Sequence, residues 1–158
     1  SAVVPAHSIR EATMSEKKEH PVPVRGSCFC QAVAFEIDLP TRSCAHCHCS
    51  MCRRVHGAGY VTWIAVPTAQ FRFVSGQDQL TVYQSSECGR RSFCQVCGSP
   101  LFCELSNHPE VIDITRASLH GPIDRDPQAH IYFTDRVDWV SLGDELPCFG
   151  GKTGMERL

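Results

Sequence analysis

The chain is organised around one stretch, Ser43-Cys44-Ala45-His46-Cys47-His48-Cys49-Ser50-Met51-Cys52-Arg53-Arg54-Val55-His56-Gly57. Four cysteines and three histidines lie within these fifteen positions, a composition that no hydrophobic core requires. Among them, Cys47, Cys49 and Cys52 form a Cys-x-Cys-x-x-Cys run, and thiolates at this spacing bind one metal ion if the backbone turns between them. We expect a loop that leads into a short helical turn at Cys52–Val55, before Gly57.

The three-cysteine run leaves two alternatives for its metal. In the first, His46, His48 or His56 supplies a fourth ligand and closes a structural zinc site. In the second, the fourth position stays open for water or substrate, as in catalytic zinc sites. Three thiolates outweigh Zn²⁺ by one unit of charge, so an open site needs compensating cations. Arg53 and Arg54 follow immediately, and either could offset the excess charge or bind a substrate carboxylate, with Arg53 the better-placed candidate for an anionic substrate.

Two further cysteine pairs lie outside this stretch, Cys28-x-Cys30 and Cys94-x-x-Cys97. The clustered cysteines therefore divide as four plus three, because two separated pairs complete one tetrahedron while the contiguous triplet holds another metal. A zinc on the four cysteines would join the first hairpin to a later one and would stabilise the fold directly. We predict two zinc ions per chain, the four-cysteine one being structural.

The remaining cysteines have no partners at metal-ligand spacing. The chain contains 11 cysteines, but their clustering argues for metal binding rather than a disulfide framework. We expect the four unclustered ones to behave as small buried apolar residues, with Cys44 also a candidate ligand or reactive thiol. His120 and His130 are isolated in the sequence, and we expect each to be an ordinary core or surface histidine. The unclustered cysteines are Cys44, Cys88, Cys103 and Cys148.

Composition limits the class of protein. A chain of 158 residues with 42% hydrophobic content suffices for one domain with a proper core. The net charge of −2 and the pI near 6.4 leave no basic surface, which argues against a nucleic-acid partner. No apolar run approaches the length of about 20 residues that spans a bilayer. We therefore expect a cytoplasmic protein without a membrane partner, whose oligomeric state the sequence does not define.

The chain is expected to contain one folded region between two short polar segments. Residues 1–22 are polar and lack periodicity, which predicts a disordered N-terminal segment, and residues 1–13 precede Met14 as a cloning remnant. A zinc-binding domain is predicted over 23–151, and a tail over 152–158. Short strands with β-branched, aromatic or alternating apolar residues predict an all-β fold. The expected strands are 24–28, 31–39, 60–67, 70–74, 80–84, 90–93, 101–105, 111–115 and 130–134.

Several of these motifs together resemble the glutathione-dependent formaldehyde-activating enzyme family, which includes the centromere protein V domain. The resemblance runs from about Gly26 to Phe149. It rests on the seven clustered cysteines in their order, on flanking residues, and on a C-terminal group. The flanking and C-terminal residues are Gly26-Ser27, Arg53, Phe93, Gly98-Ser99-Pro100-Leu101, His130-Ile131-Tyr132, Trp139 and Leu146-Pro147.

The resemblance implies a β-tent-like fold of small antiparallel sheets stapled by zinc. It also implies a structural zinc on Cys28, Cys30, Cys94 and Cys97, and a catalytic zinc on Cys47, Cys49 and Cys52. The implied activity is that of a carbon–sulfur lyase that condenses formaldehyde with glutathione to S-hydroxymethylglutathione, or that acts on a related thiol adduct. The alternatives are a non-enzymatic zinc-binding module with two structural zincs and a thiol-redox or metal-buffering protein.

Overall fold

The computed structural model describes residues 22–158, so nearly all of the segment expected to be disordered lies outside the described residues. One helix, α1 (Ser50–His56), and four 3-10 turns accompany the strands. The turns are η1 (Thr68–Gln70), η2 (Gln77–Gln79), η3 (Arg116–Ser118) and η4 (Phe133–Asp135). The strands are β1 (Val24–Ser27), β2 (Ala34–Ile37), β3 (Ser43–Cys47), β4 (Val61–Pro67), β5 (Phe71–Ser75), β6 (Leu80–Gln84), β7 (Gly89–Cys94), β8 (Pro100–Leu105), β9 (Val111–Thr115), β10 (His130–Ile131), β11 (Phe149–Gly150) and β12 (Glu156–Arg157).

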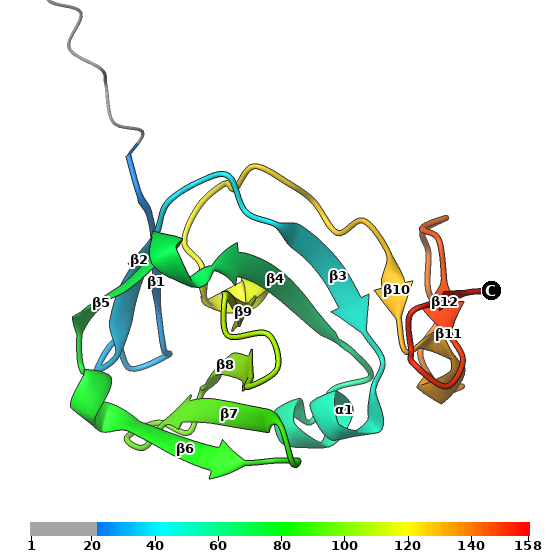
Figure 1. Cartoon of the computed structure of the whole chain (residues 1–158), viewed down its shortest axis with the longest axis horizontal. Helices are drawn as coiled ribbons and strands as arrows, with labels where there is room; N and C mark the ends of the chain where they lie inside the picture. The colour runs from blue at the N-terminus through cyan, green and yellow to red at the C-terminus, as the bar shows by residue number, and fades with distance from the viewer. Residues whose placement is uncertain (1–21) are drawn as a thin grey trace, which may run out of the picture.

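The strands form three sheets. A three-stranded sheet has the order β1-β2-β5, and a seven-stranded sheet has the order β10-β3-β4-β9-β8-β7-β6. The third sheet is the small pair β11-β12. All neighbouring strands run antiparallel except β10, which pairs parallel to β3. The prediction of an all-β fold of antiparallel sheets is confirmed. Figure 1 shows the large sheet bending from β10 round to β6, with α1 inside the bend.

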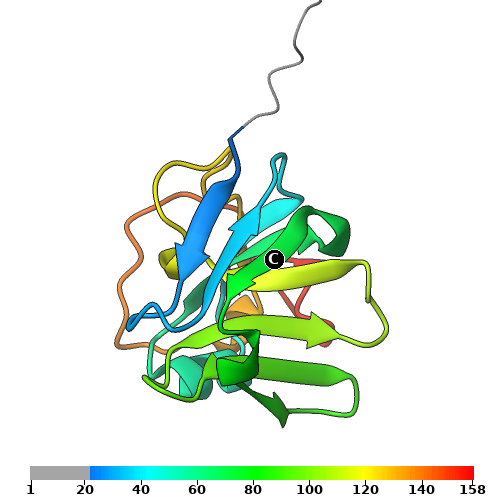
Figure 2. The same ribbon diagram turned by 90° about the vertical axis from the view of Figure 1, so that its left-hand side faces the viewer.

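The main core lies between the small and the large sheet. In β2 the alternation predicted from the sequence is confirmed, since Phe35 and Ile37 are fully buried. The Phe35 ring contacts Phe102 of the large sheet at 5.1 Å between ring centroids, in an edge-on arrangement. A Cβ atom on Gly26 would lie 2.3 Å from the Phe35 ring, so glycine is needed in β1 for this ring to fit. Figure 2 shows β1, β2 and β5 lying across the strands of the large sheet.

The other face of the large sheet carries a second buried cluster, which we call the three-cysteine cluster after Cys47, Cys49 and Cys52, although Cys103 also belongs to it. Alternation along β3 and β4 brings Cys47, Val61 and Trp63 to this face, whereas Cys44 and Ile64 face the main core. The helix α1 covers the cluster. Its members are Cys47, Cys49, Cys52, Val61, Trp63 and Cys103.

Two expectations about local structure were wrong. The cysteine-rich stretch is not a loop with one helical turn: Ser43–Cys47 is strand β3, and α1 spans Ser50–His56. β3 forms because β4 pairs along its whole length and β10 pairs with its end. The predicted strand 130–134 shortens to β10, because Tyr132 adopts a positive φ of 52° and the turn η4 follows. Gly57 ends α1 in the left-handed conformation with φ 59°, as predicted.

The C-terminal segment packs beside β10. The β11-β12 pair brings Gly154 to Tyr132, whose backbone N–H donates to the Gly154 carbonyl at 2.9 Å. β12 lies within residues 152–158, which were expected to be a tail. In the described part of the chain, no helix has the length and apolar character needed to cross a membrane.

Candidate metal centres

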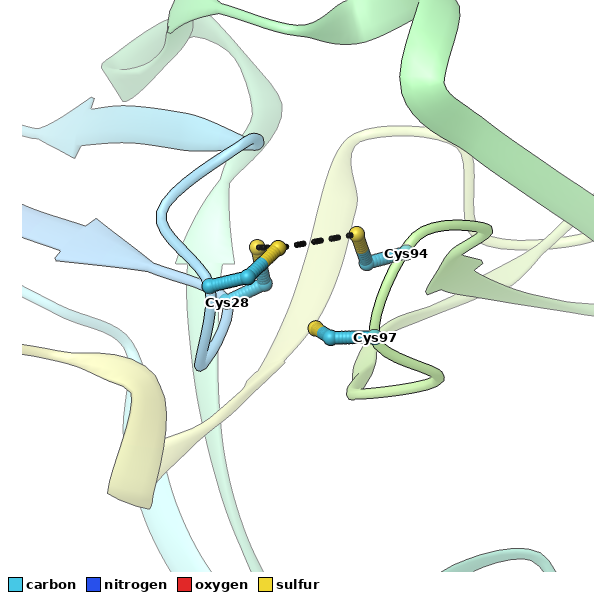
Figure 3. Close-up of side chains that lie close together, drawn as sticks. Cys28, Cys94 and Cys97 are labelled. Carbon is cyan, nitrogen blue, oxygen red and sulfur yellow. Dashed lines mark hydrogen bonds between the residues drawn. The ribbon is translucent and has the colours of Figure 1, made fainter.

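The four cysteines Cys28, Cys30, Cys94 and Cys97 converge on one point. Their Sγ atoms all lie within 4.8 Å of one another, with Cys28 to Cys30 at 3.6 Å and Cys30 to Cys94 at 3.9 Å. Four sulfurs at Zn–S bond lengths of about 2.3 Å on a tetrahedron are about 3.8 Å apart. Figure 3 shows the side chains pointing toward one another from two separate loops. The arrangement therefore fits a four-coordinate metal ion.

Both loops are shaped for this convergence. The first joins β1 to β2 and turns at Gln31, which has a positive φ of 64°, while the Val33 N–H donates to Cys28 Sγ at 3.3 Å. The second joins β7 to β8, and Gly98 at φ 77° donates its N–H to the Cys94 carbonyl at 2.8 Å. Because β1 and β2 belong to the small sheet and β7 and β8 to the large one, a metal here joins the two sheets.

Hydrogen bonding favours the thiolate form of one cysteine at this centre, Cys97. The Ser99 hydroxyl lies 3.1 Å from Cys97 Sγ, and this contact is the main cause that lowers the pKa of the Cys97 thiol to about 5. Backbone N–H groups add to the same effect. Since thiolates rather than thiols bind metal, these contacts prepare the loop for a cation.

The three cysteines predicted as the second centre lie in one buried cluster, although among the described residues only the four-cysteine group has all its sulfur atoms within 4.8 Å of one another. Cys47 ends β3, Cys49 is the N-cap residue of α1 and Cys52 lies in its first turn. Cys47 Sγ and Cys52 Sγ are 3.6 Å apart, which again matches the sulfur spacing on a zinc tetrahedron of about 3.8 Å. Hydrogen bonding with Cys47 and then Cys52 lowers the pKa of the Cys49 thiol. None of the three side chains exceeds 8% exposure.

His48, between Cys47 and Cys49, is anchored at three places. Its backbone N–H donates to the Ile131 carbonyl at 3.0 Å, and its carbonyl accepts from Arg53 Nε at 3.0 Å. Its ring Nε2 lies 2.8 Å from His130 Nδ1. These bonds hold the backbone that carries the first two thiols of the cluster, and one of them ties the Arg53 side chain of α1 to the preceding loop.

His130, expected to be an ordinary histidine, belongs to a buried network. It is 1% exposed, and its second ring nitrogen, Nε2, lies 2.9 Å from Asp144 Oδ1. That contact is the main cause that lowers the pKa of Asp144. Burial, followed by repulsion from His130, lowers the pKa of His48 to about 4. The network therefore joins β10, the loop before α1 and the segment before β11.

The other two candidate histidines make different contacts. His46 Nδ1 lies 2.9 Å from Thr62 Oγ1, and burial is the main cause that lowers its pKa. The His56 ring packs edge-on against Trp63 at 5.2 Å between ring centroids. Burial, followed by repulsion from Arg91, lowers the pKa of His56 to about 4. His120 lies elsewhere, 3.0 Å from Ser27 Oγ.

Three residues lie near the three-cysteine cluster although the sequence analysis did not place them there. Arg91 is 7% exposed, and its Nη2 lies 3.4 Å from Cys52 Sγ. Cys103 is the cross-strand neighbour of Arg91 and belongs to the cluster, and burial raises the pKa of its thiol to about 11. Tyr132 packs against the same cluster, and burial followed by the neighbouring thiols raises its pKa. Strand alternation was the only available signal, and it does not say which face of β7 points inward.

The unclustered cysteines are distributed over the fold. Cys44 is 1% exposed in the main core, on the face of β3 opposite to Cys47, so it does not join the three thiols. Burial is the main cause that raises its pKa. Cys88 and Cys148 are half-buried, and Cys148 Sγ contacts the Leu146 carbonyl at 3.6 Å.

Comparisons with known proteins identify the family of this chain. The sequence profile of the glutathione-dependent formaldehyde-activating enzyme family matches residues 23–135. A Halomonas elongata protein named "Putative glutathione-dependent formaldehyde-activating enzyme" is 28% identical over 137 residues, covering 81% of this chain and 87% of that protein. An uncharacterized lyase of Schizosaccharomyces pombe is 32% identical over 131 residues, covering 78% and 88%.

A solved structure extends the comparison to three dimensions. The crystal structure of a Rhodobacter sphaeroides protein matches with a TM-score of 0.54 and 29% identity, covering 63% of this chain and 91% of that one. The fold and its cysteine groups define a β-rich protein with loops that could bind a metal ion. The chain belongs to the glutathione-dependent formaldehyde-activating enzyme family, as its motifs indicated.

Proposed function

We propose that the protein is a zinc-dependent carbon–sulfur lyase that acts on glutathione or a related thiol adduct, like an S-hydroxymethylglutathione synthase. Membership of the family and the names of its relatives support a lyase. The observation that carries the proposal is the packing of Cys47, Cys49 and Cys52, in which Cys47 and Cys52 have the sulfur spacing of a zinc site and three thiols leave one position for a substrate.

The two centres would have different roles. Cys28, Cys30, Cys94 and Cys97 would hold a structural zinc, since four thiolates fill its coordination sphere. Cys47, Cys49 and Cys52 would hold the catalytic zinc. Zinc in an open site supplies Lewis-acid chemistry and lowers the pKa of a thiol that binds it.

The chain's own residues would position the thiol substrate. Arg53 uses Nε to hold the His48 carbonyl, and its two outer nitrogens could bind a glutathione carboxylate. Tyr132 packs on the cluster and would form one wall for the substrate. In the reaction, the glutathione sulfur bonds to the carbonyl carbon of formaldehyde, the thiol proton is released, and the carbonyl oxygen takes up a proton.

The test is the rate of exchange between glutathione and its hydroxymethyl adduct in ¹³C-formaldehyde solution, followed by NMR exchange spectroscopy. Wild type and Cys88→Ser, which alters an unclustered cysteine, should both accelerate the exchange. Cys49→Ser should remain folded and lose the acceleration. The proposal would be overturned if wild type holding both zinc ions gave no acceleration, or if Cys49→Ser were as active as wild type.

One observation favours the alternative of a non-enzymatic module with two structural zincs. The three thiols are at most 8% exposed, as in a closed site. Cobalt substitution separates the two readings, because an open site changes its absorption spectrum when glutathione enters. A spectrum that glutathione leaves unchanged at both centres would favour the module.

A further inference from the structure

Arg91 is a buried cation that lacks the partners such a side chain needs. The residue is 7% exposed, and its Nη2 donates to Cys52 Sγ at 3.4 Å. Its Nε and Nη1 are buried without any hydrogen-bond partner among the described residues. An unpaired buried charge costs several kcal/mol, so a cation in this place implies a negative charge close by.

The neighbouring strands place no carboxylate in hydrogen-bond contact with Arg91. Arg91, Cys103 and Asp113 lie in one row across β7, β8 and β9, with Cys103 between the other two. Strands in a sheet are about 4.8 Å apart, so Asp113 is about two spacings from Arg91, and it attracts Arg91 across Cys103 without a hydrogen bond. The hydrogen-bond contact of the Arg91 guanidinium is with Cys52 of the three-cysteine cluster.

The charge of the two centres explains why one of them needs a counter-ion. Zn²⁺ on three thiolates has a net charge of −1, and one arginine brings the total to zero. The three thiols are buried, so water and salt cannot screen that charge well. The four-cysteine centre differs, because Cys30 is exposed and Cys97 is half-buried, so solvent reaches its excess charge.

We propose that Arg91 is the positioning residue that neutralises the three-cysteine zinc centre and so determines how tightly this centre holds its metal. The inference rests on the proposed function in one respect, the presence of zinc on Cys47, Cys49 and Cys52. It replaces the expectation that the compensating cation comes from the arginines that follow Cys52 in the sequence. Arg53 is then available for the substrate.

The test measures zinc affinity at the two centres by competition with a chromophoric chelator. Arg91→Met removes the charge and keeps an unbranched side chain that suits a buried position. In this variant, zinc at the three-cysteine centre should bind at least tenfold more weakly than in wild type, while zinc at the four-cysteine centre keeps its affinity. Arg91→Lys keeps the charge and should retain the second zinc within about threefold of wild type.

Arg90→Met is the matched control. Arg90 is the exposed neighbour on the same strand and pairs with Glu104 at 3.5 Å, so its removal should change neither zinc affinity. If Arg91→Met does not fold, Arg91→Gln tests the same loss of charge with a polar side chain.

The outcomes separate the two proposals. Wild-type affinity for both zincs in a folded neutral variant would overturn the role of Arg91 and leave the proposed function intact. If Arg91→Met and Arg91→Lys lost zinc from the three-cysteine centre equally, the shape of the Arg91 side chain rather than its charge would matter. That result would also overturn the proposed role of Arg91. A wild-type protein that binds only one zinc would overturn both proposals.

Discussion

The rings of His48 and His130 form a hydrogen bond of 2.8 Å between Nε2 and Nδ1, although the two residues are 82 positions apart. His48 lies between two thiols of the three-cysteine cluster, and His130 belongs to the short strand β10. The bond therefore connects the backbone of the candidate catalytic centre to a segment that contributes no metal ligand.

Replacing His130 by Ala tests this connection. The change leaves a buried nitrogen of His48 without a partner, which should lower the free energy of unfolding by about 1–3 kcal/mol. Zinc should also leave the three-cysteine centre faster, while the four-cysteine centre is unaffected. Urea unfolding at fixed zinc concentration and zinc transfer to a chelator measure the two effects. His108→Ala, at an exposed turn, is the control and should change neither quantity.

Replacing Cys94 by Ser should damage the fold itself. Cys94 is fully buried, and a structural zinc contributes about 10–16 kcal/mol in zinc-finger peptides, comparable to the whole stability of a domain. We expect an insoluble protein or a large fall in Tm by scanning calorimetry. The half-buried Cys148→Ser should behave like wild type. A well-folded Cys94→Ser protein with its full zinc content would refute the four-cysteine assignment.

Arg53→Ala should weaken glutathione binding. Loss of a charge-assisted contact costs about 1.5–3 kcal/mol, which raises Kd by about 10- to 150-fold. Titration calorimetry with glutathione gives the affinity, and zinc content shows whether the loss of the His48 contact has disturbed the metal centre instead. Arg54→Ala, on the exposed side of α1, should bind normally. Equal affinities in all three proteins would exclude Arg53 as the substrate anchor.

Asp113 should make stability depend on pH. Burial, opposed by attraction to Arg91, raises the pKa of its carboxyl from 3.8 to about 6 in the folded protein. The folded state thus keeps a proton that the unfolded chain releases, so stability falls as pH rises from about 4 to 6.

Asp113→Asn removes this dependence. Above pH 7 it should raise the free energy of unfolding by about 2–3 kcal/mol, since each pKa unit is about 1.4 kcal/mol, and below pH 4 it should have no effect. Urea titrations at several pH values provide the measurement. The exposed Asp138→Asn serves as control. If Asp113→Asn raised the free energy of unfolding by the same amount at pH 4 and pH 8, the buried-carboxyl explanation would be contradicted.

The four-cysteine centre could be predicted from the sequence because each half is local. Cys-x-Cys and Cys-x-x-Cys require tight turns, and Gly98 indicates one of them. The fold class followed from alternation in short segments such as β2. Strand β3 could not be recognised, because its cysteines, alanine and histidine have no marked strand preference and its pairing with β4 decides the conformation.

The surroundings of the three-cysteine cluster were beyond sequence reasoning for a different reason. Arg91 and Cys103 reach the cluster only because β7 and β8 pair in the observed register. His130 looked isolated because its partner lies in a distant part of the chain. Such contacts depend on which face of a strand points inward and on which distant segments pair. A single sequence does not reveal either.

The alternation along β3 has a consequence for how the protein tolerates change. Cys44 and Cys47 lie on opposite faces, one in the main core and one in the three-cysteine cluster. A slip of β3 by one residue along β4 would exchange the faces and move Cys47 away from Cys52. Substitutions that loosen this pairing, even far from any thiol, should therefore abolish metal occupancy in a fraction of molecules that still fold. The register of β3 on β4 therefore determines which molecules of the protein can assemble the three-cysteine centre.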